Sequence, residues 1–371
     1  MPLYLNDDQA MLRDTARGFM AEEGAISKQL RHWRDKGCSD GFGHALWKQF
    51  AELGFTGILI DEEDGGLGLG HVEAGIVLEE IGRNLTPSPF LVTAIAVVEA
   101  LKGSGQRERW YPGILSGNTV AALAVDEGPK HRPEAIAMKA ERAGNGFRLS
   151  GRKQFVVQGA SADLIVVAAR AEEGLTLFAV EKEARGLDVD GVRLADASIG
   201  ARMTFDGVEV DADAVIGEVG AGESVLSRAL GAARAGAASE MVGVASGAMD
   251  MTVDYLRQRK QFGKLIGEFQ SLQFRAAHLY SEIEIARAAA LKAQQLLDEG
   301  SEEAEAMVSV AKAKAGRVST LAVQEGVQMH GGIGMTDEYD IGLYMKRDRV
   351  LNELFGDPAY HADKLARMKG Y

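Results

Sequence analysis

The apolar residues of this chain change their spacing twice, and this change constrains the fold more than any other feature of the sequence. Up to about residue 117, and again from Glu223 onward, they recur every three or four residues, as along one face of a helix. From Asn118 to about residue 222 they form short β-branched or alternating runs. We therefore predict an α+β fold with an N-terminal all-α domain (1–117), a central antiparallel β domain (118–222) and a C-terminal four-helix bundle (223–371).

The central segment predicts strands because Gly, Asp and Asn bound each of its apolar runs. No helical pattern separates the runs, which favours hairpin connections and hence an antiparallel sheet. Five runs are clear in the sequence: VAALAV, GFRLSGRKQFVVQG, DLIVVAAR, LTLFAVEK and MTFDGVEV.

The C-terminal segment predicts three long helices, because apolar stripes with three- and four-residue spacing begin at Met241, Leu272 and Val308. The stripes contain many Ala residues, so the helix axes can approach one another closely. Helices that are rich in Ala on several faces also often pack between subunits, and we therefore expect an oligomer.

Composition and charge exclude several classes of protein. With 46% hydrophobic and 26% charged residues among 371, the chain has the composition of a globular protein with large cores. Its net charge of −13 argues against nucleic acid or an anionic membrane as the main partner. Cys38 is the only cysteine, so no internal disulfide can form. The N-terminus does not resemble a signal peptide and no apolar run approaches a membrane span, so we expect a cytoplasmic protein.

The stretch Tyr255–Gln270, YLRQRKQFGKLIGEFQ, is the first candidate for a binding site. Cations crowd the expected end of one helix, and two Gly residues let the backbone bend before the next helix. One interpretation is an ordinary helical hairpin. The other is an anion clamp, in which Arg259 and Gln270 offer planar donors to a phosphate and Phe262 offers an apolar wall. Gln328–Gly334, QMHGGIG, would supply the second half, because its Gly residues let the backbone approach a phosphate.

Other motifs indicate less. The run Gly65–Gly70 lacks the Lys-Ser/Thr of a phosphate loop and follows several acids, so we interpret it as an ordinary loop. The seven His residues show no metal-binding spacing, and the G-x-S-x-G of a serine hydrolase does not occur. We expect no bound metal.

In this order of segments, the motifs resemble those of the acyl-CoA dehydrogenase family of flavoproteins, over essentially the whole chain. The pattern R-x-x-F-G-(x)₆-Q at Arg259–Gln270, followed by Q-x-x-G-G-x-G at Gln328–Gly334, is specific to that family in this context. Two N-terminal stretches also match the family, LWKQFAELGFTGILIDEEDGGLG and EEIGR. The C-terminal FGDPAYHADKLARM resembles members that form one half of an unequal pair, such as the small subunit of pimeloyl-CoA dehydrogenase and subunits of steroid side-chain dehydrogenases.

The resemblance implies FAD as the cofactor. Arg259 should pair with the pyrophosphate of FAD, Phe262 should pack beside it, and Gln270 should lie near the adenosine half. In the family this clamp is shared across a dimer interface, so the remaining contacts should come from a neighbouring subunit: Gln328, Gly331 and Gly332.

The flavin should lie against the β domain, near Asp126–Glu127 and Phe155–Val157, where the chain departs from the family pattern. Where the family has Thr-Glu-Pro, this chain has Asp-Glu-Gly at residues 126–128. The family's later Gly-Ser-Asp is absent, and residues 129–132, PKHR, stand in its place. At the position of a Trp that stacks on the flavin in the family, this chain has Phe155, whose ring should still stack on the flavin. The Thr that hydrogen-bonds flavin N5 is Val157, whose side chain donates nothing. These changes imply weakened FAD binding, or FAD held mainly at a partner's site.

The largest departure concerns the catalytic base. The family's reaction removes the proton α to a thioester carbonyl, so a carboxylate must reach the α carbon in a site dry enough to raise its pKa. The family's usual Glu, in Tyr-Glu-Gly-Thr, is Phe355 here, and a second family position for the base is Ala233. Glu240 lies two helical turns beyond Ala233, on roughly the same face. Glu240 is therefore our candidate base, and Asp357 is the alternative.

A second interpretation of Glu240 stays open. It lies at the edge of an apolar stripe, and a half-buried carboxylate needs either a partner or a function. A structural ion pair, with Arg234 or Arg275 as the suggested partner, would explain it equally well.

The leading hypothesis is an FAD-dependent acyl-CoA dehydrogenase subunit that converts an acyl-CoA of fatty acid or steroid catabolism to a 2,3-enoyl-CoA, with hydride transfer to flavin N5. It would form a homotetramer, or a heterotetramer with a paralogous chain, and pass electrons to an electron-transferring flavoprotein. The first alternative is a non-catalytic partner subunit. The second is a flavin-dependent oxygenase on the same fold.

Overall fold

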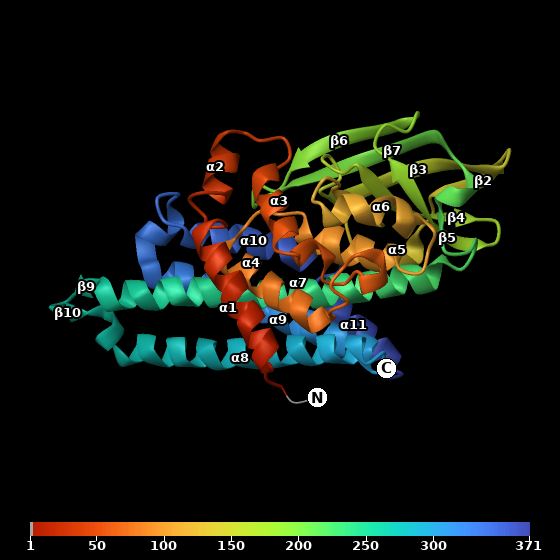
Figure 1. Cartoon of the computed structure of the whole chain (residues 1–371). Coiled ribbons are helices and arrows are strands. Elements are labelled where there is room, and N and C mark those ends of the chain that lie inside the picture. Colours follow the sequence, from red (N-terminus) through yellow and green to blue (C-terminus); the bar gives the residue numbers. More distant parts are fainter. Residues whose placement is uncertain (1–2) are drawn as a thin grey trace. The chain divides into compact units, whose positions relative to one another are not determined.

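The computed structural model describes residues 3–371 and divides them into two compact units (Figure 1). The first unit contains the chain up to Arg31, His71–Thr86 and Arg234–Tyr371, and the second contains His32–Gly70 and Pro87–Ala233. The three predicted domains, with boundaries after residues 117 and 222, stay a prediction. Within residues 3–371, no helix has the length and apolar character that a membrane crossing requires. Nor do three His, Cys, Asp or Glu side chains gather there as a metal site would need.

The first unit consists of helices and one small hairpin (Figure 1). α1 packs on α4, which packs on α8, while α8, α10 and α11 all pack on α9. These helices confirm the predicted helical C-terminal part of the fold. Their bounds are α1 Asp7–Glu22, α4 His71–Asn84, α8 Gln270–Asp298, α9 Ala304–His330, α10 Ile341–Glu353 and α11 Pro358–Met368, and α7, Gly222–Gln258, belongs to this unit from Arg234 onward.

Two glycines let the backbones of α4 and α7 touch within this unit. A Cβ atom on Gly82 of α4 would lie 2.0 Å from the carbonyl oxygen of Glu240. A Cβ atom on Gly243 of α7 would lie 1.9 Å from the carbonyl oxygen of Glu79. No side chain fits at either position without separating the two helices.

The second unit combines short helices with one β-sheet (Figure 1). α3 ends before Gly54, which adopts a left-handed conformation with φ of +77°. α2, Leu30–Asp35, spans the boundary between the units. The remaining helical segments are α3 His44–Glu52, a π-helix Leu91–Val97, α5 Val98–Leu101 and α6 Gln106–Leu115.

The sheet has the order β6-β7-β3-β2-β4-β5-β8, and β1 pairs with β4. Most pairs are antiparallel, as predicted, but β1 and β2 both run parallel to β4, with Ala121 opposite Leu164 and Lys139 opposite Arg170, so the sheet is mixed. The parallel pairs arise because the β2–β3 hairpin and the β3–β4 connection each reverse the chain once, which returns β4 to the direction of β1 and β2. The strands are β1 Ala121–Ala124, β2 Lys139–Ala143, β3 Gly146–Val157, β4 Leu164–Ala171, β5 Gly174–Glu181, β6 Leu187–Arg193, β7 Ile199–Val210 and β8 Val215–Ile216.

All five predicted runs are strands, namely β1, β3, β4, β5 and β7. The sequence did not reveal β2 and β6, because neither has a buried apolar face that would give an alternating pattern. Only Ala140 of β2 is buried, and no residue of β6 is.

Candidate functional site

Arg259 leads into a tight hairpin beyond the end of α7 (Figure 1). Its N–H donates to the carbonyl of Tyr255 at 2.9 Å, and its own carbonyl accepts from the N–H of Ile266 at 2.9 Å. β9 (Lys260–Gln261) pairs antiparallel with β10 (Lys264–Leu265). Phe262 and Gly263 form the turn with φ of +52° and +81°, as a two-residue hairpin turn requires. The turn holds Phe262 out in solvent, with 90% of the residue exposed.

The predicted clamp residues offer unused hydrogen-bond donors. Arg259 is exposed and has no ion-pair partner among residues 3–371, and Gln270, the first residue of α8, is exposed as well. Gln328 is exposed on the last turn of α9. Beyond that helix, a Cβ atom on Gly331 or Gly332 would meet nothing within 4 Å, so their backbone is open to a ligand.

The two halves of the clamp lie at the same end of three helices. Leu256 of α7, Ile266 before α8 and Met329 of α9 form one small apolar cluster. The His330 ring stacks on Tyr255 with 4.4 Å between ring centroids. A free guanidinium, an exposed amide and open Gly backbone are the donors that a diphosphate needs, so this end of the first unit fits the pyrophosphate of FAD. Sharing of the clamp between subunits stays a prediction.

In the second unit, the end of β1 lies against a bulge in β3. The Gln154 N–H donates to the Asp126 carbonyl at 2.7 Å, and the pairing of β3 with β7 shifts register between Lys153 and Val156. Phe155, in that bulge, has φ of +52° and is half-buried. The structure thus brings Asp126 and Phe155 together, as the resemblance implied, and places Val157 at the buried end of the same strand.

A buried lysine fixes this part of the sheet. Lys153 is fully buried and donates to the Val125 carbonyl at 3.0 Å and to the Glu127 carboxylate at 2.7 Å. Burial lowers the pKa of Lys153. Burial opposes ionisation of Glu127 too, but the hydrogen bond and charge of Lys153, together with the N–H groups of Ala137 and Met138, outweigh it and lower the pKa of Glu127. Asp126 itself accepts from His131 Nδ1 at 2.9 Å, so none of these acids points free toward a substrate.

Glu240, the candidate base, is buried in an ion pair. The residue is 2% exposed, and its Oε1 accepts from Arg347 Nε at 2.8 Å and Nη2 at 2.5 Å. The partner is therefore Arg347 of α10, which the sequence analysis did not suggest. Of the two suggested partners, Arg275 pairs with Glu325 and Arg234 donates to the Phe355 carbonyl.

Asp357, the alternative base, has a structural role. Its Oδ1 accepts from the Tyr360 N–H at 2.8 Å and so caps the N-terminus of α11. A capping carboxylate is held against the backbone by this bond, which argues against its reaching a substrate carbon.

The loop Leu354–Asp357, where the family's Glu would lie, is held by three buried donors. Lys312 Nζ donates to the carbonyls of Leu351 at 2.9 Å and Gly356 at 3.1 Å. Arg234 Nε and His361 Nε2 both reach the Phe355 carbonyl, at 3.1 and 3.2 Å. Burial, with a smaller contribution from Arg234, lowers the pKa of Lys312 to about 7. Phe355 is 5% exposed with φ of +60°, so these bonds hold a strained residue.

Sequence reasoning missed the two buried lysines. Lys312 occupies a position of the α9 stripe between Val308 and Ala315, and a charged residue inside an apolar stripe was the available signal. Lys153 gave a weaker signal, because Arg148, Ser150 and Arg152 of the same strand are polar residues that are exposed.

Comparison with known proteins matches both ends of the chain to one family. Residues 6–118 match the N-terminal domain of acyl-CoA dehydrogenases and residues 220–369 match the C-terminal domain. Isovaleryl-CoA dehydrogenase of Solanum tuberosum is 32% identical over 83% of this chain and 78% of its own length. Cyclohex-1-ene-1-carbonyl-CoA dehydrogenase of Geobacter metallireducens is 30% identical over 95% of each chain.

Solved structures agree with this match. A variant of the Tcur3481-Tcur3483 steroid acyl-CoA dehydrogenase superposes with a TM-score of 0.90 at 28% identity, over 98% of each chain. An acyl-CoA dehydrogenase from Geobacillus kaustophilus has a TM-score of 0.90 at 25% identity, over 99% of each chain. The chain belongs to the acyl-CoA dehydrogenase family of FAD-dependent oxidoreductases, as its motifs predicted.

Proposed function

We propose that this chain is one subunit of an acyl-CoA dehydrogenase that oxidises an acyl-CoA between its α and β carbons. The observation that carries the proposal is the set of free donors at the ends of α7, α8 and α9, in a chain of this family. FAD, when bound, supplies the hydride acceptor. Arg259 and Gln270 hold its diphosphate and adenosine half, with Phe262 packed alongside. Gln328, Gly331 and Gly332 complete the clamp from a neighbouring subunit.

The flavin side of the site belongs to the β-sheet. Phe155 would pack against the ring system, and Lys153 holds the segment next to Asp126 in place through Val125 and Glu127. Val157 leaves the flavin without the side-chain hydrogen bond that a Thr would give.

Glu240 remains the candidate for the proton acceptor. Its ion pair with Arg347 also supports a different function for the chain. The pair holds the Glu240 carboxylate against Arg347, and a guanidinium beside a carboxylate stabilises its charged form. Together with Phe355 at the family's usual position and Asp357 as a helix cap, the pair supports a second function. In it, this chain completes the FAD site of a paralogous subunit that carries the base.

The deciding experiment is Glu240→Gln in the purified complex, with flavin bleaching followed anaerobically after acyl-CoA is added. If Glu240 is the base, reduction should slow by at least about 10² while FAD stays bound. Glu302→Gln, at an exposed glutamate before α9, is the matched control. Unchanged bleaching would assign the base to a partner chain, and a fall in melting temperature with normal bleaching would identify Glu240 as structural.

We also propose a long or bulky acyl group as the substrate, and an electron-transferring flavoprotein as the electron acceptor. The support for the substrate is the Ala- and Gly-rich segment 230–247 of α7, together with relatives named for branched, cyclic and steroid substrates. Good turnover of butyryl-CoA, with none of long-chain or polycyclic acyl-CoA, would contradict this choice.

A further inference from the structure

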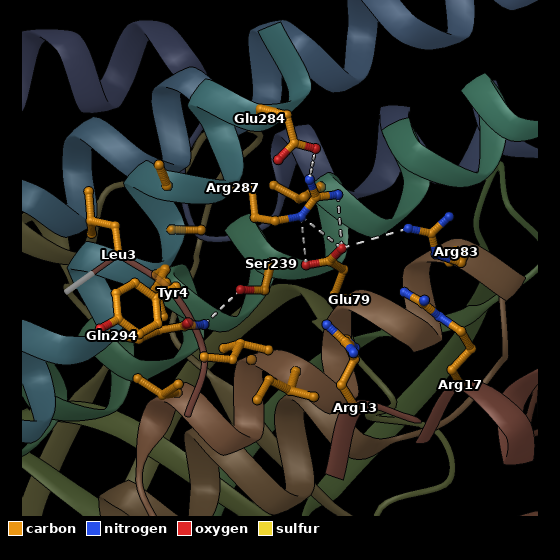
Figure 2. A pocket seen from close by; sticks show the side chains of 18 residues that line it. Leu3, Tyr4, Arg13, Arg17, Glu79, Arg83, Ser239, Glu284, Arg287 and Gln294 are labelled. Carbon is orange, nitrogen blue, oxygen red and sulfur yellow. Dashed lines mark hydrogen bonds and ion pairs between the residues drawn. The ribbon is translucent and has the colours of Figure 1, made fainter. Parts of the chain in front are cut away.

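A pocket of about 450 Å³ opens between α1, α4, α7 and α8 of the first unit (Figure 2). It lies far from the cofactor clamp, because Val242 in its wall precedes Arg259 by 17 residues, or about 26 Å along a helix. The proposed dehydrogenase reaction makes no use of it. Its volume lies within the range of small-molecule sites.

One end of the pocket is apolar and carries a buried amide (Figure 2). Gln294 is 3% exposed, and its Nε2 donates to Ser239 Oγ at 2.7 Å. Gly75 makes room for this amide, since a Cβ atom there would lie 1.9 Å from Gln294 Nε2. Val72, Ile76 and Leu291 form the surrounding wall.

The Gln294 oxygen is the unused group at this end. Among residues 3–371, Gln294 Oε1 has no hydrogen-bond partner, although the side chain is almost fully buried. The oxygen belongs to a residue that lines the pocket. A ligand that brings a hydroxyl or amide donor to Oε1 gains a hydrogen bond inside the pocket.

The other end of the pocket is charged (Figure 2). Arg287 is neutralised there by Glu79 at 3.0 Å and also contacts Glu284. Arg13 and Arg17 lie one turn apart on α1 and both line the pocket. Like charges at this spacing repel one another on a helix, and an anion between them would relieve the repulsion.

The two arginines differ in how they are compensated. Arg17 pairs with the buried Glu80 at 2.7 Å. Arg13 pairs with its neighbour Asp14 at 2.8 Å, and that side chain is 67% exposed. An ion pair so open to water holds Arg13 weakly, so its guanidinium is available to a ligand carboxylate.

We propose that this pocket binds a small carboxylic acid whose apolar chain carries a hydroxyl or amide at its far end. The carboxylate pairs with Arg13 and Arg17, the chain lies against Val72, Ile76 and Leu291, and the distal group donates to Gln294 Oε1. The pocket is a ligand site separate from the clamp, on the same helices α7 and α8.

Calorimetric titration of the purified protein with ω-hydroxy acids of four to eight carbons tests the proposal without any acyl-CoA turnover. At least one acid should bind saturably at one site per chain. Arg13→Gln should weaken its binding by about tenfold, the value of one charge-assisted contact. Gln294→Leu should weaken the binding of the ω-hydroxy acid but leave the binding of the unsubstituted acid of the same length unchanged. Arg202→Gln, at an exposed arginine of β7, should change neither.

Three results would overturn the proposal. The first is no saturable binding by the wild-type protein at millimolar acid. The second is equal binding of an alkylammonium of the same length, which would show that the carboxylates of the pocket dominate. The third is binding that survives both Arg13→Gln and Gln294→Leu. Melting temperatures of the variants separate loss of the ligand contact from loss of the fold.

Discussion

Two Phe-Gly dipeptides of the first unit both have positive φ angles, but one is exposed to solvent and the other is buried. Phe262–Gly263 at the hairpin has φ of +52° and +81°, and Phe355–Gly356 before α11 has φ of +60° and +106°. Phe262 is 90% exposed, whereas Phe355 is 5% exposed. The same sequence element is therefore exposed at the proposed clamp and buried in the core before α11.

The difference lies in what holds each strained residue. Phe262 is held by the two-stranded hairpin and by an edge-on contact with the Phe269 ring. Phe355 is held through carbonyl groups by Lys312, Arg234 and His361, which come from α9, α7 and α11. Strain persists where the surroundings determine the conformation. The comparison predicts that mutations at the loop cost stability, while mutations at the hairpin cost ligand binding.

Lys312→Met should produce the largest effect on stability. At pH 9, where Lys312 is uncharged, the change leaves two buried carbonyls without a donor, and we expect a loss of about 3 kcal/mol. Lys264→Met in the hairpin, at an exposed lysine, should change stability by less than about 0.5 kcal/mol. Denaturant unfolding of both variants measures the contrast, and equal effects would remove the distinction between the two regions.

The two glycines of the dipeptides provide a matched pair. Gly356→Ala should cost about 3 kcal/mol, because φ of +106° is unfavourable and the new Cβ would lie 2.4 Å from the Tyr360 ring. Gly263→Ala should cost about 1 kcal/mol, since a Cβ there meets nothing within 4 Å and only the backbone preference is lost. Melting temperatures of the two variants compare their losses of stability. A larger loss for Gly263→Ala than for Gly356→Ala would contradict our account of the buried loop.

The wild-type protein should gain stability as the pH rises above 7 through the Lys312 contribution. Burial lowers the pKa of this lysine to about 7 in the folded protein, against about 10.4 in the unfolded chain. Between these values the unfolded chain binds more protons, so unfolding free energy should rise by up to about 1.4 kcal/mol per pH unit. This rise of unfolding free energy with pH should disappear in the Lys312→Met variant and persist in the Lys264→Met variant. An identical pH profile for all three proteins would show that Lys312 does not titrate in this range.

Phe262→Ser should have the smallest effect on stability and a clear effect on the cofactor. An exposed side chain contributes less than about 0.5 kcal/mol to the fold. We expect weaker retention of FAD by the assembled protein, measured as flavin released on gel filtration. Full retention of FAD would indicate that the hairpin lies outside the cofactor site.

Local patterns made much of this molecule predictable. The apolar stripes that begin at Met241, Leu272 and Val308 lie on α7, α8 and α9, and such stripes depend on residues that are near neighbours in the sequence. The strands with a buried alternating face were predicted for the same reason.

Long-range pairs could not be predicted in this way. Arg347 and Glu240 are 107 positions apart, and Lys312 lies 39 positions from Leu351. Such pairs have no periodic signature, because the folded chain alone brings their members together. The roles of the buried acids therefore required the structure, whereas the clamp motif was visible in the sequence.

The close approach of the α4 and α7 backbones at Gly82 and Gly243 has a consequence for how the gene can change. In a duplicated gene, most codons of α4 and α7 can drift, because side chains can repack around a substitution. These two codons cannot, since even an alanine would strike the opposite backbone at about 2 Å. The carbonyls that they meet belong to Glu79 and Glu240, so a copy that loses either glycine shifts an acid of the ligand pocket and the candidate base together.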